Sequence, residues 1–230
     1  MLSKRLLTAV EMITKGNIVA DVGCDHAYTS IYLRKENIAP KVIAMDVNRG
    51  PLARAKEHIE EAGLIDSISL RLSDGLEKLS ENEVDTVLIC GMGGLLMIKI
   101  LSARITKTVK ELVLQPQSEV AQVRHFLHKE GYEIEKEHIL KEDGKFYVVM
   151  RAVPKEQVQP YNEECHYLYG KLLIEEKSEI LKEFLQREYN LKMEVWEALQ
   201  EKETENALAR KKALQEEFEH IRKVMEWITK

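Results

Sequence analysis

Residues 17–27 read Asn-Ile-Val-Ala-Asp-Val-Gly-Cys-Asp-His-Ala, a short apolar run that ends in a glycine turn. The run predicts a buried β-strand over 17–22, and the amphipathic stretch after it predicts a helix over 26–35. The same alternation continues along the chain, with further strands predicted over 41–45, 67–72, 84–90 and 109–114, and further helices over 51–62, 95–103 and 118–129. It is typical of an α/β fold with a doubly wound parallel sheet.

The end of this region breaks the alternation. Two strand-like runs, 132–140 and 146–153, are joined by a polar segment that contains Asp143-Gly144, a strong β-hairpin signal. A dinucleotide-binding sheet does not usually end in an antiparallel hairpin. The order of elements instead resembles the Rossmann-like class I methyltransferase fold, which adds such a hairpin after its fifth helix.

Composition changes near Pro154. Ten of the eleven glycines precede this residue, and neither glycine nor proline occurs after Gly170, so long helices are expected there. Residues 1–153 are predicted to form the sheet domain, 154–160 a linker, and 161–230 an α-helical coiled-coil domain. Two apolar seams separated by a polar break at 201–206 favour an antiparallel helical hairpin. One continuous helix in an intermolecular coiled coil is the alternative.

Composition also excludes several classes of protein. With 44% apolar and 32% charged residues among 230, the chain is neither collagen-like, low in complexity nor wholly disordered. Its longest uncharged stretch, Thr86–Ile98, is shorter than the roughly 20 residues that span a membrane, and early charges leave no signal-peptide core. Three isolated cysteines give no metal-site or disulfide spacing. We therefore expect a cytoplasmic protein that has no membrane partner.

The loop after the first strand favours a nucleoside cofactor. It holds one glycine, Gly23, whereas a nicotinamide site prefers G-x-G-x-x-G for its pyrophosphate. Asp21 at the strand end would repel a pyrophosphate and attract the ammonium of a methionine moiety, which favours S-adenosylmethionine. Asp46 ends the second strand, where a carboxylate can accept both hydroxyls of a ribose. An ordinary strand-to-helix turn is the alternative for the first loop.

Later strand ends add polar and glycine-rich turns. Asp74-Gly75 follows the third strand, where the carboxylate could accept from the exocyclic amine of adenine. The fourth strand ends in Cys90-Gly-Met-Gly-Gly94, a glycine floor with room for a substrate base. Cys90 could be a nucleophile, although a buried packing role is the more common use of cysteine. Gln115-Pro116 ends the fifth strand, where the amide could read the edge of a planar base.

Together these motifs resemble one family. The matching runs are LSKRL at 2–6, VADVGCDHAY at 19–28, AMDVN at 44–48, SDGL at 73–76, ICGMGG at 89–94 and LQPQ at 114–117. The chain is similar throughout to the bacterial transfer-RNA adenine-22 N1-methyltransferases, the TrmK family, in which a class I methyltransferase domain precedes a helical coiled-coil domain. Cys24 departs from the family pattern, where a small residue such as serine is expected.

The resemblance implies methyl transfer from S-adenosylmethionine, which leaves as S-adenosylhomocysteine, to N1 of adenine 22 in transfer RNA. The residues that it assigns to the cofactor are Asp21, Gly23, Asp25, His26, Asp46, Asp74, Gly75, Gly91, Met92 and Gly93. Those it assigns to the substrate are Arg5, Gly94 and Gln115, and those it assigns to catalysis are Gln115, Pro116 and Asp25. No metal is expected, and His26 is expected to orient a partner or to pack at the helix start.

The expected chemistry needs little covalent help, because adenine N1 has a lone pair and no proton to remove. Alignment and desolvation would supply most of the acceleration. Asp25 and the carbonyls of Gln115 are candidates for stabilising the cationic methylated base.

The net charge of −5 gives no general support to RNA binding. Transfer RNA would need local basic clusters, for which the candidates are residues 4–5, 34–35, 49 with 54, and 210–212. We expect a monomer or a weak dimer. Three alternatives are a methyltransferase that acts on a small molecule or a protein, a non-catalytic nucleoside-binding adaptor, and a dehydrogenase.

Overall fold

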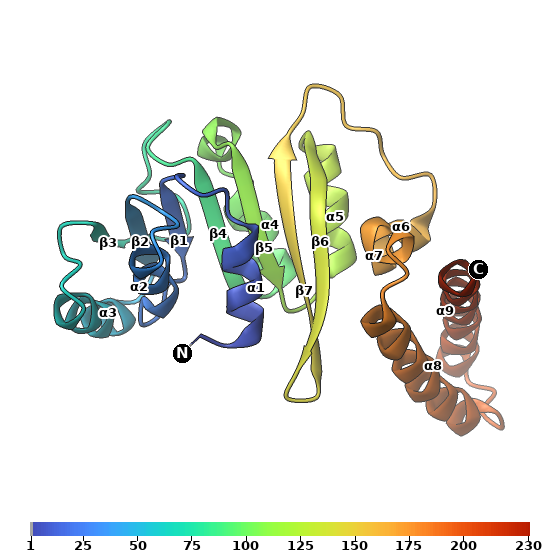
Figure 1. Cartoon of the computed structure of the whole chain (residues 1–230). Helices are drawn as coiled ribbons and strands as arrows, with labels where there is room; N and C mark the ends of the chain where they lie inside the picture. The colour runs from blue at the N-terminus through green and yellow to red at the C-terminus, as the bar shows by residue number, and fades with distance from the viewer. Residues whose placement is uncertain (1) are drawn as a thin grey trace. The chain divides into compact units, whose positions relative to one another are not determined.

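The structure is a computed structural model that describes residues 2–230 (Figure 1). The chain divides into two compact units, of which the first ends at Pro160 and the second runs Tyr161–Lys230. The second unit begins where the sequence analysis started its helical domain. The roles predicted for the two units, a methyltransferase domain and a coiled-coil domain, stay predictions.

The first unit is an α/β sheet with helices on both faces. Its strands are β1 (Val19–Val22), β2 (Val42–Asp46), β3 (Ile68–Leu72), β4 (Thr86–Met92), β5 (Glu111–Pro116), β6 (Tyr132–Glu142) and β7 (Lys145–Pro154). Its helices are α1 (Lys4–Met12), α2 (Tyr28–Lys35), α3 (Arg49–Glu61), α4 (Gly94–Leu101), the 3-10 turn η1 (Arg104–Thr108) and α5 (Val120–Lys129). The predicted α/β class is therefore confirmed.

The sheet order is β3-β2-β1-β4-β5-β7-β6. The first five strands pair in parallel, and β7 then pairs antiparallel with both β5 and β6. The hairpin that the Asp143-Gly144 turn predicts is present. Since the five parallel strands point the same way, their carboxyl ends meet at one edge, which we call the carboxyl edge.

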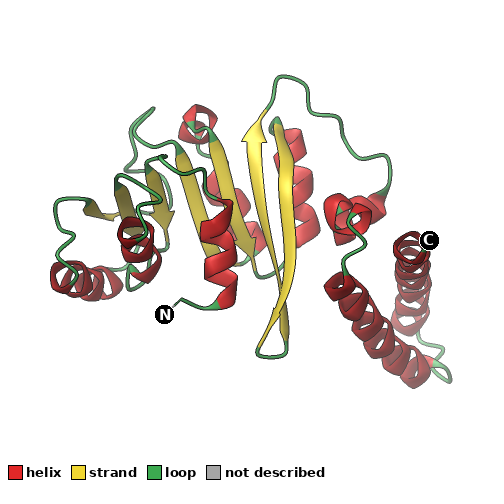
Figure 2. Cartoon of the chain, in the orientation of Figure 1, coloured by secondary structure: helices red, strands yellow, loops and turns green. Residues whose placement is uncertain are grey.

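Helices cover both faces of the sheet (Figure 2). On one face α1, α2 and α3 pack through Val10, Leu33 and Ile59 among others. On the other face lie α4 and α5, which bury Met97 and Leu127 respectively. Because both faces are covered, β1, β2 and β5 are buried along their whole length, which explains their continuous apolar sequences.

Several predicted boundaries differ from the observed ones by one or two residues, and one of these differences has a clear local reason. The helix expected from His26 begins two residues later, at Tyr28. Asp25 and Ala27 both adopt positive φ, at 49° and 59°, so the chain makes a left-handed turn before the helix can start. The turn η1 was not predicted.

The secondary structure of the second unit consists of helices. Two short helices, α6 (Glu164–Tyr169) and α7 (Lys171–Glu175), were not predicted and precede the long helices α8 (Glu179–Leu199) and α9 (Glu205–Thr229). The long helices pack together through Leu181 and Leu185 of α8 and the α9 residues Leu214, Phe218 and Ile221.

Local signals explain where the long helices begin. Ser178 and Thr204 cap α8 and α9, because their hydroxyls accept from the backbone N–H of Leu181 and Ala207. The structure thus has the predicted helical hairpin rather than one continuous helix, while supercoiling of the pair stays a prediction. Within residues 2–230, no helix has the length and hydropathy that crossing a bilayer requires.

Candidate functional site

The loop after β1 approaches the end of β4 closely. Gly23 has φ +74°, and a Cβ there would lie 2.3 Å from Cε of Met92. The positive φ favours glycine at this position, and any side chain there would also have to displace the flexible end of Met92. The contact brings the predicted loop and the predicted floor residue Met92 together.

Asp21 is a buried carboxyl beneath this loop. It is 5% exposed, and the Ser30 hydroxyl donates to it over 2.6 Å. Burial raises the pKa of Asp21 to about 6, and the neighbouring Asp46 carboxylate adds to the increase, while the bond from Ser30 opposes it. A cation placed beside Asp21 would lower this raised pKa and favour the ionised form.

Asp46 joins the first two loops of the carboxyl edge. One carboxylate oxygen accepts from the backbone N–H of Asn48 at 2.8 Å, and the other from that of Asp25 at 3.4 Å. The side chain is held in one orientation at the end of β2 before any ligand binds. Such a pre-oriented carboxylate suits a vicinal diol.

The turn after β3 packs against α4. Asp74 is exposed, whereas Gly75 has φ +53° and a Cβ there would lie 3.0 Å from Ile100. The Ser73 hydroxyl donates to the Gly75 carbonyl at 2.9 Å. The turn is therefore rigid and presents the Asp74 carboxylate to solvent.

The glycine floor has two parts that differ in surroundings. A Cβ on Gly94 would lie 2.5 Å from the carbonyl oxygen of Ser118, and one on Gly93 would lie 3.1 Å from its hydroxyl. Gly94 is thus needed for packing against the loop before α5, whereas a side chain at Gly93 would require only that the Ser118 hydroxyl shift slightly. Gly91 faces functional groups instead, since its Cβ position lies 3.6 Å from Arg5 and 3.7 Å from Gln117.

Gln115 is buried rather than presented to a ligand. It has no exposed surface, and its side-chain oxygen accepts from Nη1 of Arg5 at 3.0 Å and from the backbone N–H of Gly91 at 3.1 Å. Its amide nitrogen donates to the Pro116 carbonyl at 3.3 Å, and Pro116 is also buried. In this geometry the Gln115 side chain holds Arg5 and the Gly91 turn, and its groups are already occupied.

Arg5 reaches the carboxyl edge from α1. Its guanidinium lies 5.7 Å from the ring centroid of Tyr147 in β7. The carboxylate of Glu142 accepts from the backbone N–H groups of Lys4 and Arg5 at 2.6 Å and 3.5 Å. Glu142 and Tyr147 are neighbours of Arg5 that were not predicted, and no local motif in the sequence could have indicated them.

His26 belongs to a cluster of three rings. The rings of Tyr28 and His58 are stacked with centroids 4.9 Å apart, and the His26 ring lies within 6 Å of both. Nε2 of His26 is 3.5 Å from the exposed Asp25 carboxylate. Among residues 2–230, Nδ1 of His26 is buried without a hydrogen-bond partner. These contacts favour the packing and orienting roles over a free imidazole base.

Cys90 packs in the sheet. Burial raises the pKa of its thiol, and the Asp21 carboxyl adds to the increase, so the reactive thiolate is disfavoured. The geometry supports the packing interpretation rather than a nucleophile.

Exposed apolar side chains line the same edge. Val47 follows β2, Leu72 ends β3, and Leu95 and Leu96 begin α4, with exposed fractions between 43% and 59%. Large apolar side chains are costly to leave in water, so a group of them around polar loops indicates a ligand surface. These residues were not predicted, although Val47 directly follows the polar strand end Asp46, which was a usable signal for that one residue.

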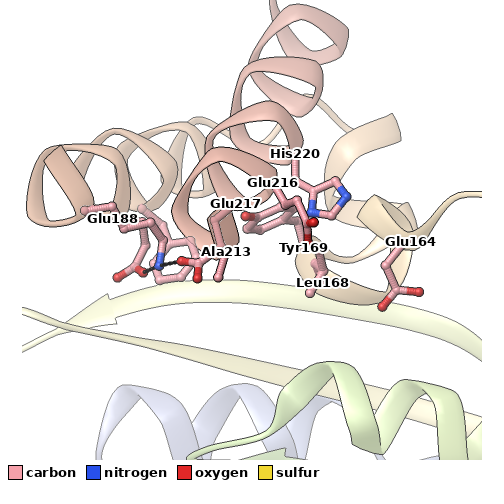
Figure 3. A pocket seen from close by; sticks show the side chains of 10 residues that line it. Glu164, Leu168, Tyr169, Glu188, Ala213, Glu216, Glu217 and His220 are labelled. Atoms are coloured by element: carbon pink, nitrogen blue, oxygen red, sulfur yellow. Dashed lines mark ion pairs between the residues drawn. The ribbon is translucent and has the colours of Figure 1, made fainter. Parts of the chain in front are cut away.

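The second unit holds a separate groove of about 560 Å³ (Figure 3). Its charged side chains largely satisfy one another, because Lys192 pairs with Glu188 at 3.4 Å and with Glu217 at 2.7 Å. In the part of the chain that the structure describes, three His, Cys, Asp or Glu side chains nowhere converge as metal ligands.

Comparison with known proteins identifies the family of the chain. Residues 19–223 match the family model "tRNA (adenine(22)-N(1))-methyltransferase". The chain is 36% identical to the protein of that name from Bacillus subtilis, over 98% of this chain and 97% of the other.

Two solved structures share the fold and carry the relevant ligands. One, from Streptococcus pneumoniae, contains S-adenosyl-L-methionine and superposes with a TM-score of 0.85 at 32% identity, covering 98% of this chain and 100% of the other. The other, M. capricolum TrmK, contains S-adenosyl-homocysteine and superposes with a TM-score of 0.87 at 27% identity, covering 99% of each chain.

Proposed function

This chain belongs to the tRNA (adenine(22)-N(1))-methyltransferase family, as its motifs indicated, and we propose that its reaction takes place at the carboxyl edge between Asp46 and Arg5. The protein is an S-adenosylmethionine-dependent methyltransferase that methylates N1 of adenine 22 in transfer RNA. The observation that carries the placement is the pre-oriented Asp46 carboxylate, which already accepts from two backbone N–H groups.

The ends of β1, β2 and β3 form the cofactor half of the edge in this proposal. Asp46 accepts both ribose hydroxyls, and Asp21 balances the ammonium of the methionine moiety. Val47 and Leu72 cover the two faces of the adenine, and exposed Asp74 accepts from its amine. These acceptor groups fit the cofactor, because three acidic side chains attract a cation that carries no phosphate.

The ends of β4 and β5 with the start of α1 form the substrate half. Gln115 acts through Arg5 here and is a positioning residue, so the proposal replaces its expected contact with the base. Arg5 contacts the target nucleotide, and Gly91 leaves space beside it. Removing the target base from its stack costs a few kcal/mol. Leu95 and Leu96 offer an apolar surface to the neighbouring bases, which lose a stacking partner in this step.

The chain's part in the chemistry is alignment. The bound cofactor supplies an electrophilic methyl group on a sulfonium. Adenine N1 provides the electron pair of the new bond, the carbon–sulfur bond breaks toward sulfur, and no proton has to leave first. The adenine becomes cationic, and the Asp25 carboxylate, 69% exposed at the first loop, stabilises that charge.

The helical unit completes the proposal. Its basic residues at 210–212, of which Arg210 and Lys212 are exposed, contact a distant part of the transfer RNA. The protein acts as a monomer or a weak dimer, and it works in the cytoplasm where its substrate is found. A variant of Lys212 tests the contact between the helical unit and the RNA.

Labelled S-adenosylmethionine and two unmodified transfer-RNA transcripts test the function. One transcript carries adenine at position 22 and the other carries guanine. We expect label in the first alone, recovered as N1-methyladenosine. Label in neither transcript, with S-adenosylhomocysteine still bound, would overturn the substrate and keep the cofactor site.

A further inference from the structure

The β6–β7 hairpin continues past the carboxyl edge beside the proposed substrate half (Figure 1). The last pair between β5 and β7 is Leu114–Met150, and β5 ends at Pro116. The β6–β7 ladder runs on as far as Glu142–Lys145. At ~3.4 Å per residue, the hairpin therefore extends past β5 by about 10 Å.

This extension is joined to the site through α1. Glu142 accepts from the first backbone N–H groups of α1, which fixes the start of that helix against the hairpin. Arg5, one residue along α1, then contacts Tyr147 of β7 and the buried Gln115. A continuous set of contacts thus connects the tip of the hairpin to the turn at Gly91.

The charged side chains at the tip of the β6–β7 hairpin favour binding of a polyanion. Lys4, Lys141 and Lys145 are all exposed, and Lys141 lies over the Phe146 ring. Within residues 2–230, no carboxylate lies within ion-pairing distance of the side chains of Lys4 and Lys145. Two carboxylates lie nearby: that of Glu142 is engaged by α1, and Asp143 occupies the turn with φ +48°.

We propose that this basic arm, formed by Lys4, Lys141 and Lys145, binds the phosphate backbone of the transfer RNA next to the target nucleotide. The inference rests on the proposed function and adds the surface by which the RNA is held. The chain as a whole carries a net charge of −5. An RNA therefore needs a local cationic surface near the site, and the arm supplies one at the edge where the base enters.

The test compares two double variants that remove the same charge. Lys4→Ala with Lys145→Ala removes two cations of the arm, whereas Lys15→Ala with Lys41→Ala removes two exposed lysines that precede β1 and β2 at the opposite edge. We expect the arm variant to raise KM for the transcript on the order of tenfold at low salt, and to lower the slope of log KM against log salt by about two. Its kcat and its affinity for S-adenosylhomocysteine should match wild type, as should all parameters of the control.

A second variant is expected to change KM for the transcript in the opposite direction. Asp143→Asn keeps a residue that tolerates positive φ and removes the acidic charge at the tip. We expect a lower KM for RNA at low salt and no change at high salt.

If wild type, the arm variant and Asp143→Asn all methylated the transcript with equal KM values, the proposal that the basic arm binds RNA would be overturned. A wild-type protein that methylates neither transcript would instead overturn the proposed function.

Discussion

The cofactor half and the substrate half of the carboxyl edge are built from contacts of very different range. In the cofactor half, Asp46 is oriented by Asn48 two residues away and by Asp25 in the neighbouring loop. In the substrate half, Gln115 meets Arg5 across 110 positions and Glu142 meets Lys4 across 138. The first half can therefore be read from short motifs, whereas the second exists only once the chain has folded.

The comparison also separates two kinds of function. Rigid local turns suit a ligand that is the same in every turnover. A surface assembled from α1, the strand ends and the hairpin can instead match one particular RNA. Variants in one half should therefore change one measured quantity and leave the other unchanged.

The largest expected effect is in the cofactor half. Asp46→Ala removes the ribose acceptor and releases the Asp25 N–H, so the affinity for S-adenosylhomocysteine should fall about 100-fold, as for loss of a pair of charge-assisted hydrogen bonds. Calorimetric titration measures it. The control is Asp66→Ala, an exposed carboxylate in the loop before β3. Unchanged affinity of Asp46→Ala for S-adenosylhomocysteine would show that Asp46 does not bind the ribose.

The next effect is in the substrate half. Gln115→Leu leaves Arg5 and the Gly91 N–H without their shared acceptor, so methylation should fall about tenfold and the free energy of unfolding by about 1–3 kcal/mol. Gln122→Leu, an exposed glutamine on α5, is the matched control. Single-turnover rates and denaturant unfolding separate the two effects. Loss of cofactor affinity as large as the loss of rate would show that the halves are not separable.

A third prediction uses the pKa of Asp21. Because burial raises it from 3.8 to about 6, the folded protein binds the extra proton between those values, and this group's contribution to stability is lost as pH rises through about 6. Cofactor binding favours the ionised form and shows the opposite trend. Affinity for S-adenosylmethionine should be about tenfold weaker at pH 5 than at pH 7.

Asp21→Asn should flatten that dependence, and Ser30→Ala, which removes the hydrogen bond that opposes the increase, should move the transition to higher pH. Titrations at several pH values measure both. A wild-type affinity that is flat from pH 5 to pH 7 would remove Asp21 from the ammonium site.

The smallest expected effect is in the helical unit. Lys212→Ala on α9 should raise KM for the transcript about two- to threefold at low salt, since one exposed cation contributes little to RNA binding. Lys177→Ala, before α8, is the control. Initial rates against RNA concentration measure the change. Equal values in the two variants would place this part of the helical unit outside the RNA contact.

Much of the fold could be predicted because its signals are local. The apolar runs, Asp143-Gly144 and the polar break at 201–206 each determine a nearby element. The role of Gln115 could not be predicted, because sequence indicates the end of a strand but not that α1 covers it. The packing constraint at Gly94 could not be predicted for a similar reason, since a Cβ there would lie 2.5 Å from the Ser118 carbonyl oxygen in another loop. Its assignment to substrate binding stays a prediction.

The most direct measurement is the affinity of Arg5→Ala for S-adenosylhomocysteine, taken together with its methylation rate at saturating cofactor. The account predicts an affinity within about twofold of wild type and a rate at least about tenfold lower, because Arg5 contacts only the substrate half. If the affinity and the rate fell together by the same factor, the division of the edge into two halves would be contradicted.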